Sequence, residues 1–167
     1  DIDITWVFFP LHPDTPAEGR TLESLFSGRA VDLDAAHKKM QQLMDTEQLP
    51  YARRTHTYNS RLAQELGKWA DQRSGDSTIH NALYRAYFAD GRNISDTQLL
   101  IQLVTEIDAD SLPPDEARQV LFERRFKNAV DADWTRANRL GITSVPTFVI
   151  GEHGIVGAQS YGVLREF

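Results

Sequence analysis

The stretch Gly141-Ile142-Thr143-Ser144-Val145-Pro146-Thr147-Phe148-Val149-Ile150 decides the fold. Its last four residues are mostly β-branched or aromatic, which favours a strand that starts directly after the proline. Gly151 to Gly154 are typical of a tight turn, and Ile155-Val156-Gly157 supplies an antiparallel partner. The sequence therefore predicts a β-hairpin near the C-terminus, followed by a helix that begins near Val163.

The other end of the chain is also apolar. Residues Ile2 to Phe9 are dense in β-branched and aromatic types, which predicts a strand covered on both faces. Pro10, Pro13 and Pro16 then remove ladder donors and disfavour a helix, and Gly19 closes the segment. We therefore expect a strand followed by an extended loop.

Between these regions the apolar residues recur at helical spacing, which predicts five helices. These helices are expected to begin near Asp32, Asn59, Asp76, Ser95 and Asp115. Asp32 or Asp34, Asn59 and Asp76 are candidate N-caps, and Ser95 with Gln98 forms a capping-box pattern. The third helix should reach Gly91, and the fifth should break near Lys127 and finish before Gly141.

The composition limits the number of domains and the kinds of partner that this protein can have. The chain has 167 residues, of which 41% are apolar and 10% aromatic, enough to fill the core of one domain. Eighteen basic and 24 acidic residues give a net charge of −6 without charged blocks, so we expect no nucleic-acid partner. No apolar run is long enough to cross a bilayer, so we expect a soluble protein without a membrane partner.

Several kinds of reactive site are excluded by the residue types. The chain has no cysteine, which rules out disulfides, thiolate metal sites and a cysteine nucleophile within it. None of the five histidines falls in a metal-binding spacing, so no metal is expected. The pairs Asp131 with Asp133 and Asp108 with Asp110 are interpreted as solvated charges at helix ends. Hydrolase and nucleotide-binding motifs are absent from the sequence.

A resemblance to a known family follows from several segments in register. The hairpin stretch with Val156-Gly157-Ala158-Gln159 resembles the second half of DsbA-like proteins of the FrnE group. Further landmarks occur in the same order: Phe9-Pro10-Leu11-His12-Pro13-Asp14, Asn59-Ser60, and Ala86-Tyr87-Phe88 with Gly91 and Ile94. The resemblance covers nearly the whole chain.

The resemblance implies an α/β, thioredoxin-like fold with a large all-helical insertion. Residues 1–31 and 142–167 would form the thioredoxin-fold part of a single DsbA-like domain. Residues 32–141 would form the helical insertion and the connecting helix.

The resemblance also implies a substrate site. The bond between Val145 and Pro146 would be cis, and Val145 would offer its backbone N–H and C=O to an extended substrate segment. Ser144, Thr147, His56 and Asn59 would lie beside the substrate. For His56 a solvent-exposed turn residue remains the alternative, and for Asn59 an N-cap.

Members of that group begin with a strand and a Cys-x-x-Cys helix that these residues do not contain. The strand would lie between the segments Ile2 to Phe9 and Thr147 to Ile150, so its absence would leave backbone groups unpaired on both. We therefore expect the fold to be incomplete at both ends and the chain to be part of a longer polypeptide. The alternative is a sheet completed by a partner chain.

The resemblance implies a cytoplasmic thiol–disulfide oxidoreductase without a bound cofactor. Its substrates would be proteins or small thiols and disulfides, and a homodimer is compatible with the family. One alternative is a glutathione-dependent enzyme of the kappa class, like 2-hydroxychromene-2-carboxylate isomerase. That class typically has a Ser-Asp pair where this chain has Ala158-Gln159. Another alternative is a redox-inactive binding module on the same fold.

Overall fold

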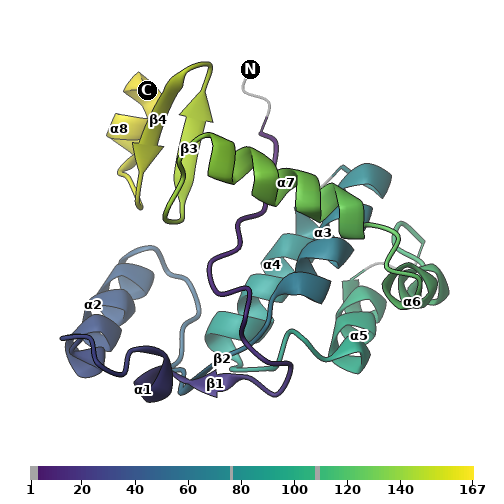
Figure 1. The fold of residues 1–167 in the computed structure, drawn as a ribbon, viewed down its shortest axis with the longest axis horizontal. Helices are drawn as coiled ribbons and strands as arrows, with labels where there is room; N and C mark the ends of the chain where they lie inside the picture. The colour runs from purple at the N-terminus through teal and green to yellow at the C-terminus, as the bar shows by residue number, and fades with distance from the viewer. Residues whose placement is uncertain (1–3, 76, 108–109) are drawn as a thin grey trace. The chain divides into compact units, whose positions relative to one another are not determined.

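The computed structural model describes residues 4–75, 77–107 and 110–167 (Figure 1). The chain divides into two compact units. The first consists of the N-terminal segment up to Leu11 together with Asn128–Phe167, and the second is His12–Lys127. The expected division into residues 1–31 with 142–167 and residues 32–141 stays a prediction about domains.

Four helices build the core of the second unit: α3 (Arg61–Arg73), α4 (Thr78–Tyr84), α5 (Thr97–Ile107) and α6 (Pro114–Phe122). Helix α3 packs against the other three, and α5 packs against α4 and α6 (Figure 1). Each helix contributes fully buried apolar side chains, among them Leu66, Ile79, Leu100, Val104 and Val120. Their burial is the main apolar contribution to the stability of this unit.

The third predicted helix is continuous but changes its winding. After α4 the backbone continues as a π-helix, η1 (Arg85–Ala89), which carries Tyr87 and Phe88. The predicted cap at Asp76 lies outside the described residues.

Helix α2 (Leu33–Thr46) confirms the prediction that a helix begins at Asp32, whose Oδ1 accepts from Ala35 N–H. The capping box at Ser95 is wrong by one residue. The Ser95 hydroxyl donates to Ala17 O, and Asp96 Oδ1 accepts from Gln98 N–H instead. Ser95 therefore holds a distant loop carbonyl, and the next residue caps α5.

The predicted break near Lys127 is confirmed. Helix α6 ends at Phe122 and α7 (Lys127–Arg139) starts five residues later, with Arg124 between them at a φ of +53°. Gly141 follows α7 at a φ of +68°, a conformation that favours glycine after a helix end.

Two short strands were not predicted from the sequence. Strand β1 (Arg20–Thr21) pairs antiparallel with β2 (His56–Thr57), with Arg20 opposite Thr57. A one-turn helix, α1 (Leu22–Leu25), follows β1 directly. Strands of two residues are too short to show a hydrophobic period, so only the pairing defines them.

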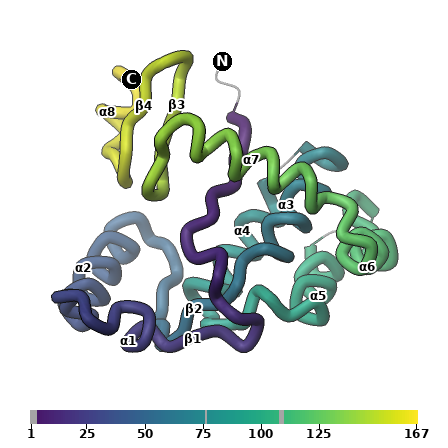
Figure 2. The backbone as a smooth tube through the Cα atoms, viewed as in Figure 1, coloured from purple at the N-terminus to yellow at the C-terminus, as the bar shows by residue number. Residues whose placement is uncertain are grey.

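The first unit contains the predicted hairpin, whose backbone can be followed in Figure 2. Strand β3 (Thr147–Ile150) pairs with β4 (His153–Val156), with Thr147 opposite Val156. The partner strand starts two residues earlier than predicted, so the turn is shorter. Helix α8 (Tyr161–Glu166) confirms the last predicted helix, and Ser160 Oγ caps it by accepting from Val163 N–H.

The prediction of a strand over Ile2 to Phe9 is wrong for the described part, residues 4–9, which has no regular structure. Ile4 and Trp6 are 73% and 40% exposed, although both faces were expected to be covered. No described strand lies beside this segment, and Phe8 N–H donates to Asp133 Oδ2 on α7 at 2.9 Å. A side chain thus takes the place of a ladder partner, and Asp133 is not merely a solvated charge.

Candidate functional site

The Val145–Pro146 junction lies between α7 and β3 in the first unit, and its peptide bond is cis. Pro146 O accepts a hydrogen bond of 2.8 Å from Gly157 N–H, just after β4. Gly157 has a φ of +90°, which a residue with a side chain rarely adopts. Pro146 is therefore fixed to the residue that follows β4, at the open end of the hairpin.

The residues on either side of the junction are fixed by a second hydrogen bond. Thr147 Oγ1 donates to Ser144 O at 2.8 Å, so these two polar residues bind each other across the junction. The bond closes a tight loop around Val145 and Pro146. Ser144 and Thr147 thus have a structural role, and substrate contact by either of them stays a prediction.

Val145 and Pro146 are both exposed in this loop, and Val145 is 49% exposed. No group in the described residues pairs with the backbone N–H or C=O of Val145. An unpaired donor and acceptor on one exposed residue can pair with an added extended segment, as at a sheet edge. The loop therefore presents the main-chain N–H and C=O of Val145, while hydrogen bonds hold the residues on either side.

The hairpin beside this loop has an exposed apolar surface. Phe148, Val149 and Ile150 on β3 are 37%, 40% and 57% exposed, and Val156 on β4 is 58% exposed. Within the described residues, β3 pairs only with β4, so its other edge carries no strand. This open edge is where the additional strand expected from the family resemblance would pair.

Residues 141–150 carry no ionisable side chain. The loop can therefore hold and orient a ligand, but it offers no side chain of its own for proton transfer or nucleophilic attack. Chemistry at this loop would have to come from groups outside it.

His56 lies in the second unit, on β2, opposite Thr21. Its Nδ1 lies 2.9 Å from Thr55 Oγ1, and its ring stacks on Tyr58 with centroids 6.1 Å apart. His56 is partly buried on a strand, not in the exposed turn that was one alternative. A role in substrate binding stays a prediction.

Asn59 is fully engaged in local structure. Its Nδ2 donates to Thr15 O at 2.7 Å and to Pro13 O at 3.2 Å, and its Oδ1 accepts from Arg61 N–H. The side chain therefore fastens the loop after His12 to the start of α3 and uses both of its donors to do so. The N-cap of α3 is Ser60, so the capping prediction for Asn59 is wrong by one residue, although its Oδ1 accepts from the first N–H of the helix. Contact with a substrate stays a prediction.

His12 is the first residue of the second unit, and its pKa is lowered. Burial lowers the pKa of His12, and the nearby Arg29 and Arg20 lower it further, so the imidazole is neutral near pH 7. In the sequence His12 stands in the landmark segment Phe9 to Asp14, but no role was predicted for it. In the described part of the chain, no three His, Asp or Glu side chains come together as a metal site.

Comparisons with known proteins agree with this architecture. Residues 1–167 match the family model of the DSBA-like thioredoxin domain, and the chain belongs to that family. A similar solved structure is that of a probable DsbA oxidoreductase from Streptomyces coelicolor, with 27% sequence identity and a TM-score of 0.80. The match covers 93% of this chain and 69% of that one. No curated protein matches the chain.

These findings confirm the fold class as a DsbA-like thioredoxin fold with a large helical insertion. They also define a family of the disulfide oxidoreductase type. Among the described residues, no helix has both the length and the apolar character needed to cross a membrane.

Proposed function

We propose that this protein is a thiol–disulfide oxidoreductase of the FrnE type that acts on protein disulfides. The 167 residues would supply the substrate-holding loop at Val145. A Cys-x-x-Cys helix from residues that precede Asp1 would supply the reactive sulfur. Membership of the DSBA-like family and the likeness to a probable DsbA oxidoreductase support this class of reaction.

One observation carries the proposal: Val145 is exposed, and within the described residues its N–H and C=O have no partner. An extended substrate segment can form two main-chain hydrogen bonds with this residue. Main-chain pairing is tolerant of sequence, which suits an enzyme that handles many unfolded chains. A small thiol or disulfide substrate could use the same two hydrogen bonds.

The chemistry would be thiol–disulfide exchange. A thiolate at a helix N-terminus is stabilised by the helix dipole, and it attacks one sulfur of the substrate disulfide. That S–S bond breaks, a mixed disulfide forms, and the other substrate sulfur leaves as a thiolate. The second cysteine of the motif then attacks the mixed disulfide and releases the substrate as a dithiol. In the reverse direction the same steps oxidise the substrate.

A cytoplasmic location and a homodimer remain part of this proposal and rest on the family resemblance. The glutathione-dependent alternative has less support. Gln159 Nε2, in the place of the expected acidic residue, donates to Val156 O at 2.7 Å and is occupied within the hairpin.

The test is an insulin reduction assay on the full-length protein. Replacing both cysteines of the motif by serine should abolish activity, and activity that survives would overturn the mechanism. Val145→Pro removes the backbone donor, and we expect kcat/KM to fall about tenfold, as for loss of one hydrogen bond. Val145→Ala keeps the donor and acceptor and is the matched control, with activity close to that of the unmodified protein.

A binding module without redox activity is the second candidate, and the absence of cysteine from these residues favours it. A full-length protein without a Cys-x-x-Cys motif would bind an extended peptide at Val145 and show no insulin reduction. Peptide binding that is lost in Val145→Pro but retained in Val145→Ala, together with no reductase activity, would establish this candidate.

A further inference from the structure

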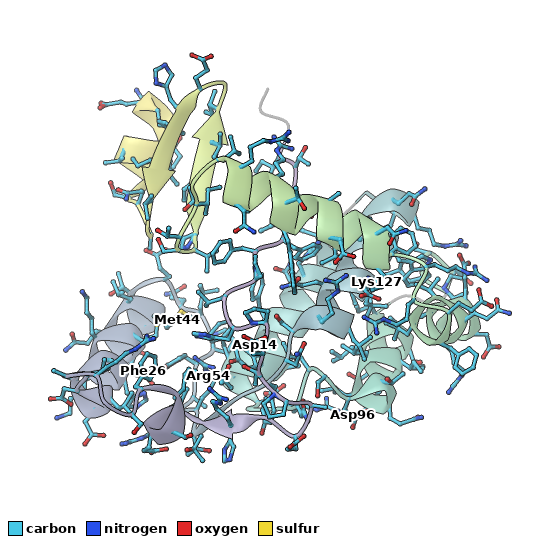
Figure 3. All side chains as sticks on the ribbon, in the orientation of Figure 1. Asp14, Phe26, Met44, Arg54, Asp96 and Lys127 are labelled. Carbon is cyan, nitrogen blue, oxygen red and sulfur yellow. The ribbon has the colours of Figure 1, made fainter. Side chains whose placement is uncertain are left out.

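Arg54 lies between α2 and β2 in the second unit and is labelled in Figure 3. Its guanidinium carbon is 4.4 Å from the centroid of the Tyr87 ring and 4.8 Å from that of Phe88. The two rings meet edge to face, at an interplanar angle of 75°. The guanidinium is thus held by two aromatic side chains at distances typical of cation–π contacts.

The two rings are themselves fixed to the segment that carries Arg54. Phe88 O accepts a hydrogen bond of 3.0 Å from Ala52 N–H, and the Tyr87 hydroxyl lies 3.1 Å from Thr57 Oγ1. These bonds tie η1 to the chain on both sides of Arg54. A π-helix places successive side chains differently from an α-helix, and such segments are frequent at functional sites.

Among the described residues, the charge of Arg54 has no acidic partner. Its Nε is buried without a hydrogen-bond partner, and within the described residues the guanidinium forms no hydrogen bond or ion pair. The neighbouring Arg53 differs, because its Nη2 donates to Asp34 Oδ1 at 2.5 Å. The buried Nε is out of reach of a ligand, but Arg54 as a whole is only partly buried, so a ligand would bind its terminal Nη groups.

We propose that Arg54 is the binding site for a carboxylate group of a ligand. A guanidinium presents parallel N–H groups in a plane, which matches the two oxygens of a carboxylate. The contacts with Tyr87 and Phe88 fix that plane before the ligand arrives, which lowers the entropy cost of binding. A single uncompensated positive charge matches one carboxylate better than a phosphate dianion. This site does not depend on the proposed redox function.

The carboxylate could belong to the C-terminus of a peptide or to an acidic side chain. Three blocked tripeptides separate these sources: acetyl-Gly-Phe-Gly with a free C-terminus, its C-terminal amide, and acetyl-Gly-Glu-Gly amide. The readout is the NMR resonance of the Arg54 Nε–H group in the full-length protein, titrated with each peptide. None of these probes contains sulfur, so the result is independent of disulfide exchange.

We expect the Arg54 Nε–H resonance to shift saturably with at least one carboxylate peptide and not with the amide of acetyl-Gly-Phe-Gly. Arg54→Lys keeps a charge near the rings but loses the planar fork, and it should weaken binding about tenfold. Arg53→Lys is the matched control and should bind as the unmodified chain does. The proposal is overturned if no carboxylate peptide shifts the resonance, if the amide shifts it equally, or if Arg54→Lys binds normally. The titration of the unmodified chain decides the question even if a variant does not fold.

Discussion

Arg124 donates two parallel hydrogen bonds to the buried carboxylate of Glu65, Nε to Oε2 and Nη2 to Oε1, each 2.7 Å long. Arg61, one turn before Glu65 on α3, donates a third bond of 2.7 Å from its Nε. Arg124 lies in the loop between α6 and α7, so this carboxylate connects that loop to the helical core. A buried carboxylate with three charge-assisted bonds is a structural element, and its loss should be measurable.

Removal of Arg124 should therefore destabilise the second unit. Arg124→Gln leaves the Glu65 carboxylate buried with Arg61 alone, and we expect a loss of about 2 kcal/mol in the free energy of unfolding. Urea unfolding followed by circular dichroism measures it. Arg125→Gln is the matched control, because the side chain of Arg125 makes exposed contacts with Glu123 and Gln119 and should change stability by less than about 0.5 kcal/mol. Equal effects of the two substitutions would contradict a structural role for the Glu65 cluster.

The same carboxylate should make stability depend on pH. Burial alone would raise the pKa of Glu65, but hydrogen bonds from Arg124 and Arg61 outweigh it, so the pKa lies below the ordinary value of 4.5. A carboxyl whose pKa is lower in the folded state contributes stability above its unfolded pKa and loses it as the pH falls through the folded pKa. We therefore expect the free energy of unfolding to fall on acidification below pH 4.5.

Urea unfolding at a series of pH values tests this dependence. Glu65→Gln should be less stable at neutral pH and should show a shallower decline on acidification, because its side chain does not titrate. Glu123→Gln changes an exposed carboxylate and should keep the slope of the unmodified chain. An unchanged slope in Glu65→Gln would show that other carboxylates cause the acid sensitivity.

Gly19 should be the glycine least tolerant of substitution in the second unit. A Cβ at this position would lie 2.5 Å from Tyr58 Cδ1 and 2.8 Å from Thr57 O, and its φ is +86°. Gly28 has a similar φ of +78°, but nothing lies within 4 Å of the place that a Cβ would occupy there. Gly28→Ala should cost about 1 kcal/mol for the backbone conformation, and Gly19→Ala at least about 2 kcal/mol more, because a backbone oxygen cannot move aside.

Thermal unfolding of the two glycine variants measures this difference. The comparison separates the conformational cost, which both variants share, from the steric cost, which only Gly19→Ala has. Similar melting temperatures would mean that β2 can move away from Gly19, and the packing of β1 on β2 would then be looser than it is in the structure.

Much of the fold was predictable because the sequence patterns that mark its helices and their ends lie within single segments. The cap at Asp32 and the apolar stripe of α2 lie within one segment, and the break before α7 follows from the residues around Lys127. The strand expected over Ile2 to Phe9 failed because a strand needs a neighbour, and the composition of a segment does not provide one. The shift of a cap from Ser95 to Asp96 had a similar cause, since the carbonyl that takes the Ser95 hydroxyl is far away in sequence.

The same distinction applies to the candidate sites. Val145 and Pro146 could be singled out because the residues that define the loop are consecutive. Arg54 could not, because a single arginine in a sequence carries no signal, and its aromatic partners Tyr87 and Phe88 lie in a distant helix. Only the folded chain shows that this arginine, unlike Arg53, has no counter-charge in the part of the chain that the structure describes.

Asn59 offers a test of the structural role that its hydrogen bonds indicate. Asn59→Asp keeps the oxygen that accepts from Arg61 N–H but loses the donors to Pro13 O and Thr15 O. We expect it to cost about 1–3 kcal/mol in the free energy of unfolding, because two loop carbonyls lose their partner. Asn59→Ala should cost more, since it also loses the bond at the start of α3. If both variants keep full stability but lose peptide binding, Asn59 contacts the substrate instead.

Val145 should differ sharply from Gly157 in the rate of amide hydrogen exchange. The Gly157 N–H donates to Pro146 O at 2.8 Å and should be protected, whereas the Val145 N–H has no partner within the described residues. We expect Val145 to exchange within about tenfold of the rate for an unstructured peptide, because an exposed, unbonded amide needs no opening step. Exchange followed by NMR on the full-length protein measures both amides in one experiment, with Gly157 as the internal control. If Val145 is as protected as Gly157 in the free chain, its donor already has a partner and cannot receive a substrate strand. If it is unprotected alone and slows when an extended peptide is added, the backbone of this one residue is where the peptide pairs.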